Sequence, residues 1–243
     1  MPTRSPVVPI LAAILAAAWL ASLPARAQAP RDTTTHPPLT GSAASLLKGG
    51  EMGELLAVYV PRGEAEVERL LDDARRSAQS AAAAIDGTRR LATDADDRAR
   101  IMKEEIETTR VRWEVARREQ NQAASNSLDI TYRRQSHERQ YLEQMREALR
   151  ADADRLEAER AAAEARVKAL ELELRVTQSN AQLSAAPTPE SVAMYRALLR
   201  DMLVADGQAA DRGRDAADKS RLVADKRLRQ LDALERLSAA PRR

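Results

Sequence analysis

The feature that most constrains the fold is a run of 99 residues, 88–186, that contains neither glycine nor proline. Glycine and proline are the residues that most often end or kink a helix, so their absence favours long, continuous α-helices. A single helix of this length would extend about 150 Å. The chain is therefore expected either to fold back on itself or to form a continuous rod with a second chain.

The spacing of apolar residues predicts a coiled coil in this region. From Val67 to Ile130, alternating steps of four and three residues visit 19 positions, and none of them is charged. This is the heptad spacing of a left-handed coiled-coil seam, and it continues through Gly87 without a break. The larger members of this first seam are Val67, Leu71, Ile85, Met102, Ile106 and Trp113.

A second seam follows in the next part of the chain. Its larger members are Leu142, Met145, Leu149, Leu156, Val167, Leu170 and Leu174. Another apolar stripe, composed mainly of alanine, runs along the same stretch from Ala148 to Leu183. Two stripes on one helix predict that this helix has two neighbouring helices.

Between the two seams, residues 121–129 are rich in Asn, Gln and Ser, whose side chains compete with the hydrogen bonds of a helical backbone. We therefore predict an antiparallel hairpin within 64–184, with its tip near 121–135. A third helix is predicted over 188–238. Its start is marked by Thr188 as N-cap, by Pro189 in the first turn and by an acidic residue next to them.

The composition supports an all-α fold. Aromatic residues make up only 2% of the chain and phenylalanine is absent, whereas alanine supplies much of the 44% hydrophobic share. Chains rich in Ala, Glu, Arg and Leu with helical periodicity are typical of long helices and coiled coils. The expected fold is all-α, a long antiparallel coiled-coil hairpin with a third helix packed back on it.

The N-terminal region has the pattern of an export signal. Arg4 precedes an uncharged apolar stretch, 7–23, and an Ala-x-Ala site ends at Ala27, after which cleavage is expected. An uncleaved membrane anchor is the alternative for residues 1–27. The next residues, 28–42, read as a disordered Pro/Thr-rich spacer, and 43–63 as a short segment that docks on the helices or binds a partner. The expected location is the periplasm or the medium.

The charge balance and residue composition argue against nucleic-acid binding, catalysis and metal binding. Arg4 and Arg26 are the only charges in the signal, so cleavage leaves 37 basic and 37 acidic residues, which does not suit a nucleic-acid-binding protein. The chain contains no cysteine, and its two histidines, His36 and His137, lie in no metal-binding or catalytic motif. We expect no enzymatic activity, no cofactor and no metal. Membrane contact is expected only through an uncleaved signal.

These observations favour an exported structural protein of the bacterial cell envelope, a scaffold or adaptor that acts through protein–protein contacts. Its partners are expected to be other proteins, or a second copy of the chain. Tyr132, His137 and Tyr141, near the predicted tip, are the candidate contact residues. The alternatives are a periplasmic chaperone that holds unfolded clients, and a helical component of a secretion or pilus assembly.

Overall fold

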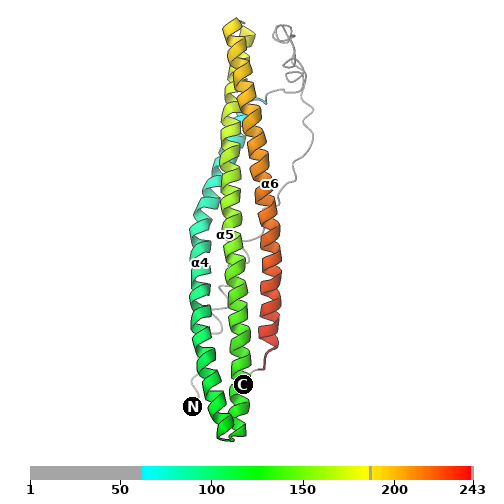
Figure 1. Ribbon diagram of the computed structural model, residues 1–243. Coiled ribbons are helices and arrows are strands. Elements are labelled where there is room, and N and C mark those ends of the chain that lie inside the picture. Colours follow the sequence, from blue (N-terminus) through cyan, green and yellow to red (C-terminus); the bar gives the residue numbers. More distant parts are fainter. Residues whose placement is uncertain (1–61, 186–187, 242–243) are drawn as a thin grey trace. The chain divides into compact units, whose positions relative to one another are not determined.

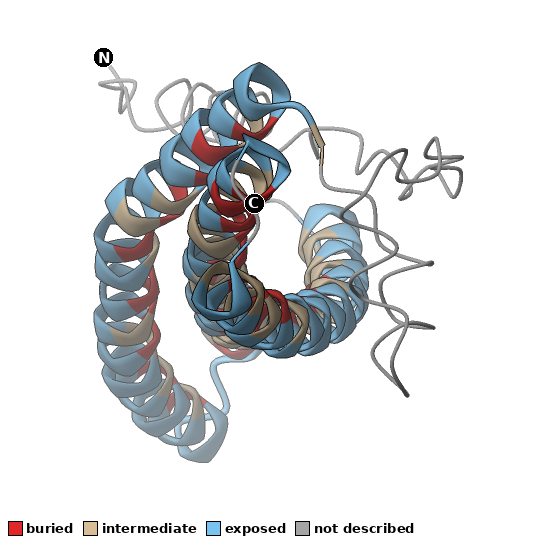
Figure 2. Cartoon of the chain, turned by 90° about the horizontal axis from the view of Figure 1, so that it is seen from above, coloured by how far each residue is buried: buried red, intermediate tan, exposed pale blue. Residues whose placement is uncertain are grey.

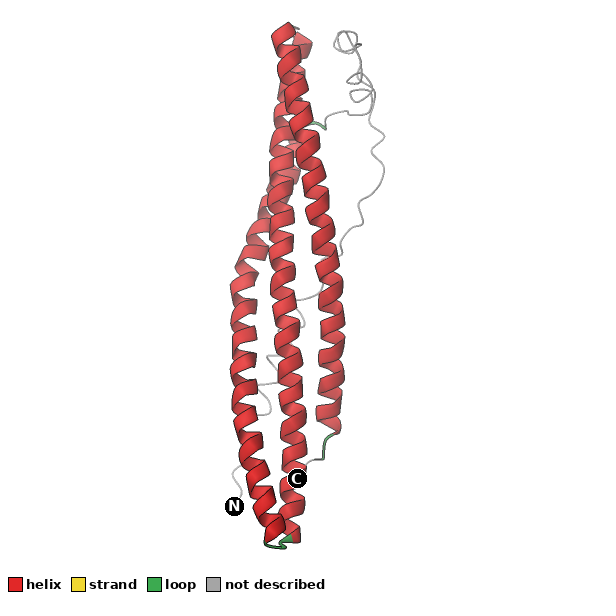
Figure 3. Ribbon diagram, in the orientation of Figure 1, coloured by secondary structure: helices red, strands yellow, loops and turns green. Residues whose placement is uncertain are grey.

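The computed structural model describes residues 62–185 and 188–241, which all belong to one unit of the chain. They form three helices, α4 (Glu64–Arg118), α5 (Gln122–Ala185) and α6 (Pro189–Ala239) (Figures 1 and 3). The predicted all-α fold, a hairpin with a third helix packed back on it, is confirmed. The predicted signal peptide with Ala27, the spacer and almost all of the 43–63 segment lie outside the described residues.

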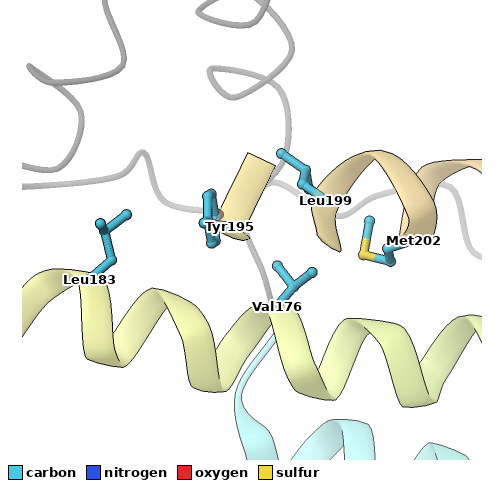
Figure 4. Close-up of a cluster of buried hydrophobic side chains, with 5 residues drawn as sticks. All are labelled: Val176, Leu183, Tyr195, Leu199 and Met202. Carbon is cyan, nitrogen blue, oxygen red and sulfur yellow. The ribbon is translucent and has the colours of Figure 1, made fainter. Parts of the chain in front are cut away.

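Helix α5 lies between the other two. Both α4 and α6 pack along it, whereas the backbones of α4 and α6 do not approach each other in the described ranges (Figure 1). Leu170 of the second seam is buried against Val67 and Leu71 of α4. On another side of α5, Val176 and Leu183 of the alanine-rich stripe rise toward α6, which contributes Tyr195, Leu199 and Met202 (Figure 4). The prediction of two neighbours for this helix is confirmed.

The buried residues of α4 follow the steps of four and three closely. All ten lie at positions of the first seam: Val67, Leu71, Ala74, Ala81, Ile85, Ala92, Ala95, Ala99, Thr109 and Ala116. Six of the ten are alanine, and small side chains let two helices pack at the short end of the usual 8–10 Å separation. In Figure 2 the buried residues lie where helices face one another, and the outward faces are exposed.

The remaining seam residues named from the sequence are buried to differing extents. Leu142, Leu156 and Leu170 are buried in α5. Seven more are half-buried: Met102, Ile106, Trp113, Met145, Leu149, Val167 and Leu174. None of the named seam residues is fully exposed.

The chain reverses at residues 119–121, and this corrects the predicted tip near 121–135. Gln120 has a φ of 55° and makes the turn, while α5 already begins at Gln122. Asn121 Oδ1 accepts a hydrogen bond from the Ala124 N–H at 3.1 Å, and Gln122 Nε2 donates to Asn126 Oδ1 at 3.0 Å. These polar side chains therefore support the first turns of α5 instead of interrupting the helix.

The start of α6 has the expected capping residues. Thr188 Oγ1 accepts a hydrogen bond from the Ser191 N–H at 3.1 Å, and Ser191 Oγ accepts one from the Thr188 N–H at 2.8 Å. At its other end, α6 stops before the hairpin turn (Figure 1). Its Ala233 lies in a cluster with Ala99, Tyr141 and Leu142, where all three helices meet. Among the described residues, the part of the hairpin beyond the end of α6 consists of α4 and α5 alone.

Candidate functional site

The three candidate contact residues all lie on α5, but the helix does not bring them onto one face. Tyr132 and His137 are half-buried. Tyr141 is 7% exposed and packs in the three-helix junction with Leu142. Nine residues make two and a half helical turns, so Tyr132 and Tyr141 point to opposite sides of α5. Tyr141 is therefore a packing residue, which corrects its assignment as a partner contact.

The described end of the hairpin carries a hollow that includes neither tyrosine. Its volume is about 420 Å³, and its lining comes from the last turns of α4, the turn itself and the first turns of α5. The lining side chains that carry charge, an aromatic ring or an amide include Trp113, Arg117, Asn121, Asn126, Asp129 and Arg133. We call this feature the tip hollow.

Two interactions organise the tip hollow. The guanidinium of Arg117 lies over the Trp113 ring, 4.9 Å from the ring centroid, which is the geometry of a cation–π contact. Across the hollow, Arg133 Nη2 forms an ion pair with Asp129 Oδ2 at 2.9 Å. The surface thus combines one aromatic ring, two guanidinium groups, a carboxylate and several amides. Such groups can donate to and accept from the backbone and polar side chains of another protein.

The tip hollow was not predicted from the sequence, because Trp113 was assigned to the seam alone. Trp113 does occupy a seam position, but it lies one step before Ala116, the last buried seam residue of α4, and remains half-buried. Arg117 follows it by four residues, the spacing that places two side chains on the same face of a helix. That spacing is the signal that could have located the site.

Two further hollows are less suited to binding or catalysis. One, of about 460 Å³, is lined by residues of α4 alone, including Asp86, Arg89 and Arg90. Another, beside Arg62 and Glu173, holds about 40 Å³, which is little more than the space of one water molecule. Neither encloses a set of groups arranged for acid–base or nucleophilic chemistry.

Within 62–185 and 188–241, no group of three or more His, Asp or Glu side chains is placed to hold a metal ion. None of the helices α4, α5 and α6 has an apolar stretch long enough to cross a membrane.

Several ion pairs join helices to one another and lie outside the tip hollow. Arg146 Nη1 of α5 bonds Asp96 Oδ1 of α4 at 2.6 Å, and this hydrogen bond lowers the pKa of Asp96 below its usual value. Lys226 Nζ of α6 bonds Glu147 Oε2 of α5 at 2.7 Å and lowers the pKa of Glu147. These pairs align the helices, so we assign them a structural role.

Comparison of the chain with known protein families, with curated proteins and with solved structures finds no match. The tip hollow is therefore identified from its geometry alone.

Proposed function

We propose that this protein is an exported coiled-coil scaffold or adaptor of the bacterial cell envelope, which acts through protein–protein contacts and has no enzymatic activity. The observation that carries this proposal is that the helices are very long and that their buried residues serve to pack one helix on another. Three helices of 55, 64 and 51 residues are packed along narrow, alanine-rich seams. Their buried side chains join helix to helix and do not surround a substrate pocket.

The hairpin tip supports the same proposal. It extends beyond the end of α6 and carries a hollow of polar and charged side chains next to one aromatic ring (Figure 1). Tryptophan and arginine are enriched in protein–protein interfaces, where they often supply much of the binding energy. A rigid two-helix arm that ends in such a surface suits the contact point of an adaptor. Export rests on the sequence of residues 1–27 described above.

In-cell photo-crosslinking tests where the protein meets its partners. A photoreactive amino acid replaces Asn126 in the tip hollow, and in a matched variant it replaces Gln79, another exposed amide that lies on α4 far from the turn. We expect Asn126 to give cross-links to one or a few discrete proteins and Gln79 to give none of them. Equal cross-linking at both positions would contradict a contact at the tip.

Two assays test the remaining parts of the proposal. Residues 1–27 fused to alkaline phosphatase, which is active only after export, should give phosphatase activity in bacteria, and an inactive fusion would contradict export. The purified protein should leave the aggregation of a urea-unfolded outer-membrane protein unchanged. Suppression of that aggregation at near-stoichiometric ratio would replace the scaffold with the holding chaperone.

A further inference from the structure

Helix α6 carries a second line of apolar residues, most of which no described helix covers. One of its sides is buried against α5 through residues such as Tyr195, Leu199 and Met202. On another side, every seventh residue is alanine or leucine: Leu203, Ala210, Ala217, Ala224 and Leu231. We call these five residues the outer face of α6. Leu203 is half-buried because it also packs against the core between α5 and α6, and the other four are exposed.

The outer face differs from its surroundings in charge. A neighbouring line of exposed positions on α6, also spaced by seven, is entirely acidic: Asp211, Asp218, Asp225 and Asp232. The outer face contains no charge over a length of about 42 Å. Leu231 is 54% exposed, and Leu228 beside it is 60% exposed. Apolar residues at a strict spacing of seven form one of the two lines of a coiled-coil seam, and the positions between them on α6 carry glycine, serine, leucine or charged side chains. This line can therefore face another helix, with the charged positions at its flanks.

The order of residues in the outer face indicates which helix that partner is. Read from either end, the face is Leu, Ala, Ala, Ala, Leu, with Ala217 at its centre. If two copies of α6 pair antiparallel about a twofold axis at Ala217, Leu203 lies opposite Leu231 of the second copy, and Ala210 lies opposite Ala224. A twofold pair requires a surface that is complementary to itself in this way.

The polar residues along one flank match in the same register. Asp206 lies between Leu203 and Ala210, and Arg227 lies between Ala224 and Leu231. In the antiparallel pair, each Asp206 therefore lies opposite Arg227 of the second copy. No ion pair joins Asp206 to another described residue, whereas Arg227 Nη2 already bonds Asp152 of α5 at 3.0 Å and has further N–H groups to donate.

The opposite flank is compatible with the same register. Gly207 faces Leu228 of the second copy, and an added Cβ at Gly207 would meet no atom within 4 Å, so there is room for that leucine. Arg214 of each copy faces Arg221 of the other, so the twofold axis generates two like-charged contacts. Each of them is held by an aspartate of its own helix, through the bonds Arg214–Asp211 at 2.9 Å and Arg221–Asp218 at 3.0 Å.

We propose that the protein forms a homodimer in which the outer face of α6 packs antiparallel on the same face of a second copy, centred on Ala217. The uncharged line and the twofold order of its residues fit this register, and the Asp206–Arg227 complementarity distinguishes it from parallel pairing. The pairing surface is separate from the tip hollow. A test of the dimer therefore does not depend on which protein the tip binds.

Cysteine cross-linking tests the register directly, because the chain contains no cysteine. In the antiparallel pair, Ala217→Cys places two thiols opposite each other and should give a disulfide-linked dimer under mild oxidation. Ala210→Cys or Ala224→Cys alone should not cross-link, but a mixture of the two variants should. Ala197→Cys, an exposed position of α6 outside the outer face and 20 residues before Ala217, is the control and should not cross-link. Equal cross-linking at 210, 217 and 224 would show parallel pairing and overturn the proposal.

Mass measurement in solution tests the association itself. By sedimentation equilibrium, the purified protein should have the mass of a dimer at micromolar concentration. Ala217→Glu, which brings two carboxylates together at the axis, should be monomeric, and Ala197→Glu should remain dimeric. Asp206→Arg, which opposes Arg227 of the second copy, should weaken the dimer by about tenfold or more, whereas Asp201→Arg should not. Circular dichroism confirms that each variant keeps its helices. A monomeric wild-type protein would overturn the proposal.

Discussion

At the scale of single residues, Tyr195 and Glu173 show two ways in which a polar group is buried in this fold. Tyr195 is 1% exposed among Val176, Leu183 and Leu199, and its Oη has no hydrogen-bond partner among the described residues. Glu173 is 4% exposed, but both of its carboxylate oxygens accept hydrogen bonds from Arg62. A polar group that is buried without a hydrogen-bond partner lowers the free energy of unfolding, whereas a hydrogen-bond partner offsets this loss. The two residues therefore predict opposite effects of substitution.

Replacing Tyr195 with phenylalanine should stabilise the protein. Tyr195→Phe removes a hydroxyl that lost its water on burial, so the free energy of unfolding at pH 7 should rise by about 1 kcal/mol. Burial also raises the pKa of Tyr195, so its contribution to stability is present below the pKa of an unfolded tyrosine and decreases as pH rises above it. In urea titrations at pH 7 and at about pH 11, Tyr195→Phe should lose this alkaline decrease. Tyr132→Phe is the matched control, and a destabilised Tyr195→Phe would show that the hydroxyl has a partner.

Breaking the Arg62–Glu173 pair should destabilise the protein more than removing both charges. The Arg62 Nε donates to Glu173 Oε1 at 2.7 Å and ties the residue before α4 to α5. Arg62→Met would leave a buried carboxylate without its cation, at a cost of about 2–4 kcal/mol in the free energy of unfolding. The double variant Arg62→Met/Glu173→Leu should recover most of that loss, as measured by a double-mutant cycle.

A surface ion pair between the same two helices is the control for that cycle. Arg75 Nη2 and Glu171 Oε1 are 2.9 Å apart and both side chains are about half exposed. Arg75→Met should cost no more than about 0.5 kcal/mol. Equal losses for Arg75→Met and Arg62→Met would contradict the special role assigned to the buried pair.

At the scale of helices, heptad spacing predicted most of the fold because residues at this spacing lie on one side of a helix and become buried against its neighbour. It failed at the turn, where Asn121 and Gln122 were taken as helix breakers. The same side chains can also cap a helix, and the choice depends on Gln120, whose positive φ has no signal in the sequence because the residue is not glycine. The tip hollow was not predicted for a related reason: Trp113 occupies a seam position and also lines the hollow, and its spacing in the sequence indicated only the seam.

The junction of the three helices should tolerate no larger side chain. Ala99 of α4 packs there with Tyr141 and Leu142 of α5 and with Ala233 of α6. Ala99→Leu adds three carbons to a filled site, so the free energy of unfolding should fall by about 1–3 kcal/mol. Ala84→Leu, at an exposed position of the same helix, should change it by less than about 0.5 kcal/mol. Equal effects in urea titration would show that the junction is loosely packed.

At the scale of the whole described part of the chain, α5 lies between α4 and α6 and holds them together, since those two helices contact each other only at the Ala99–Ala233 junction. The Asp96–Arg146 pair links it to α4, and the Glu147–Lys226 pair links it to α6. Arg146 and Lys226 hold the pKa values of these two carboxyl groups below their usual range, chiefly by direct hydrogen bonds. Both carboxylates are largely solvated, so each pair contributes modestly. Their common dependence on ionised acid nevertheless makes the alignment of all three helices sensitive to pH.

This sensitivity should appear as a loss of stability in acid. Because the folded pKa values of Asp96 and Glu147 lie below those of the unfolded chain, their contribution is complete above the unfolded values, near 4, and decreases as pH falls through the folded ones. The Tm, followed by circular dichroism, should therefore fall between about pH 5 and pH 3. The double variant Asp96→Asn/Glu147→Gln should start from a lower Tm at pH 7 and fall less steeply. Asp232→Asn, an exposed acid of α6, should retain the wild-type profile. A double variant with the wild-type slope would mean that other carboxylates align the helices.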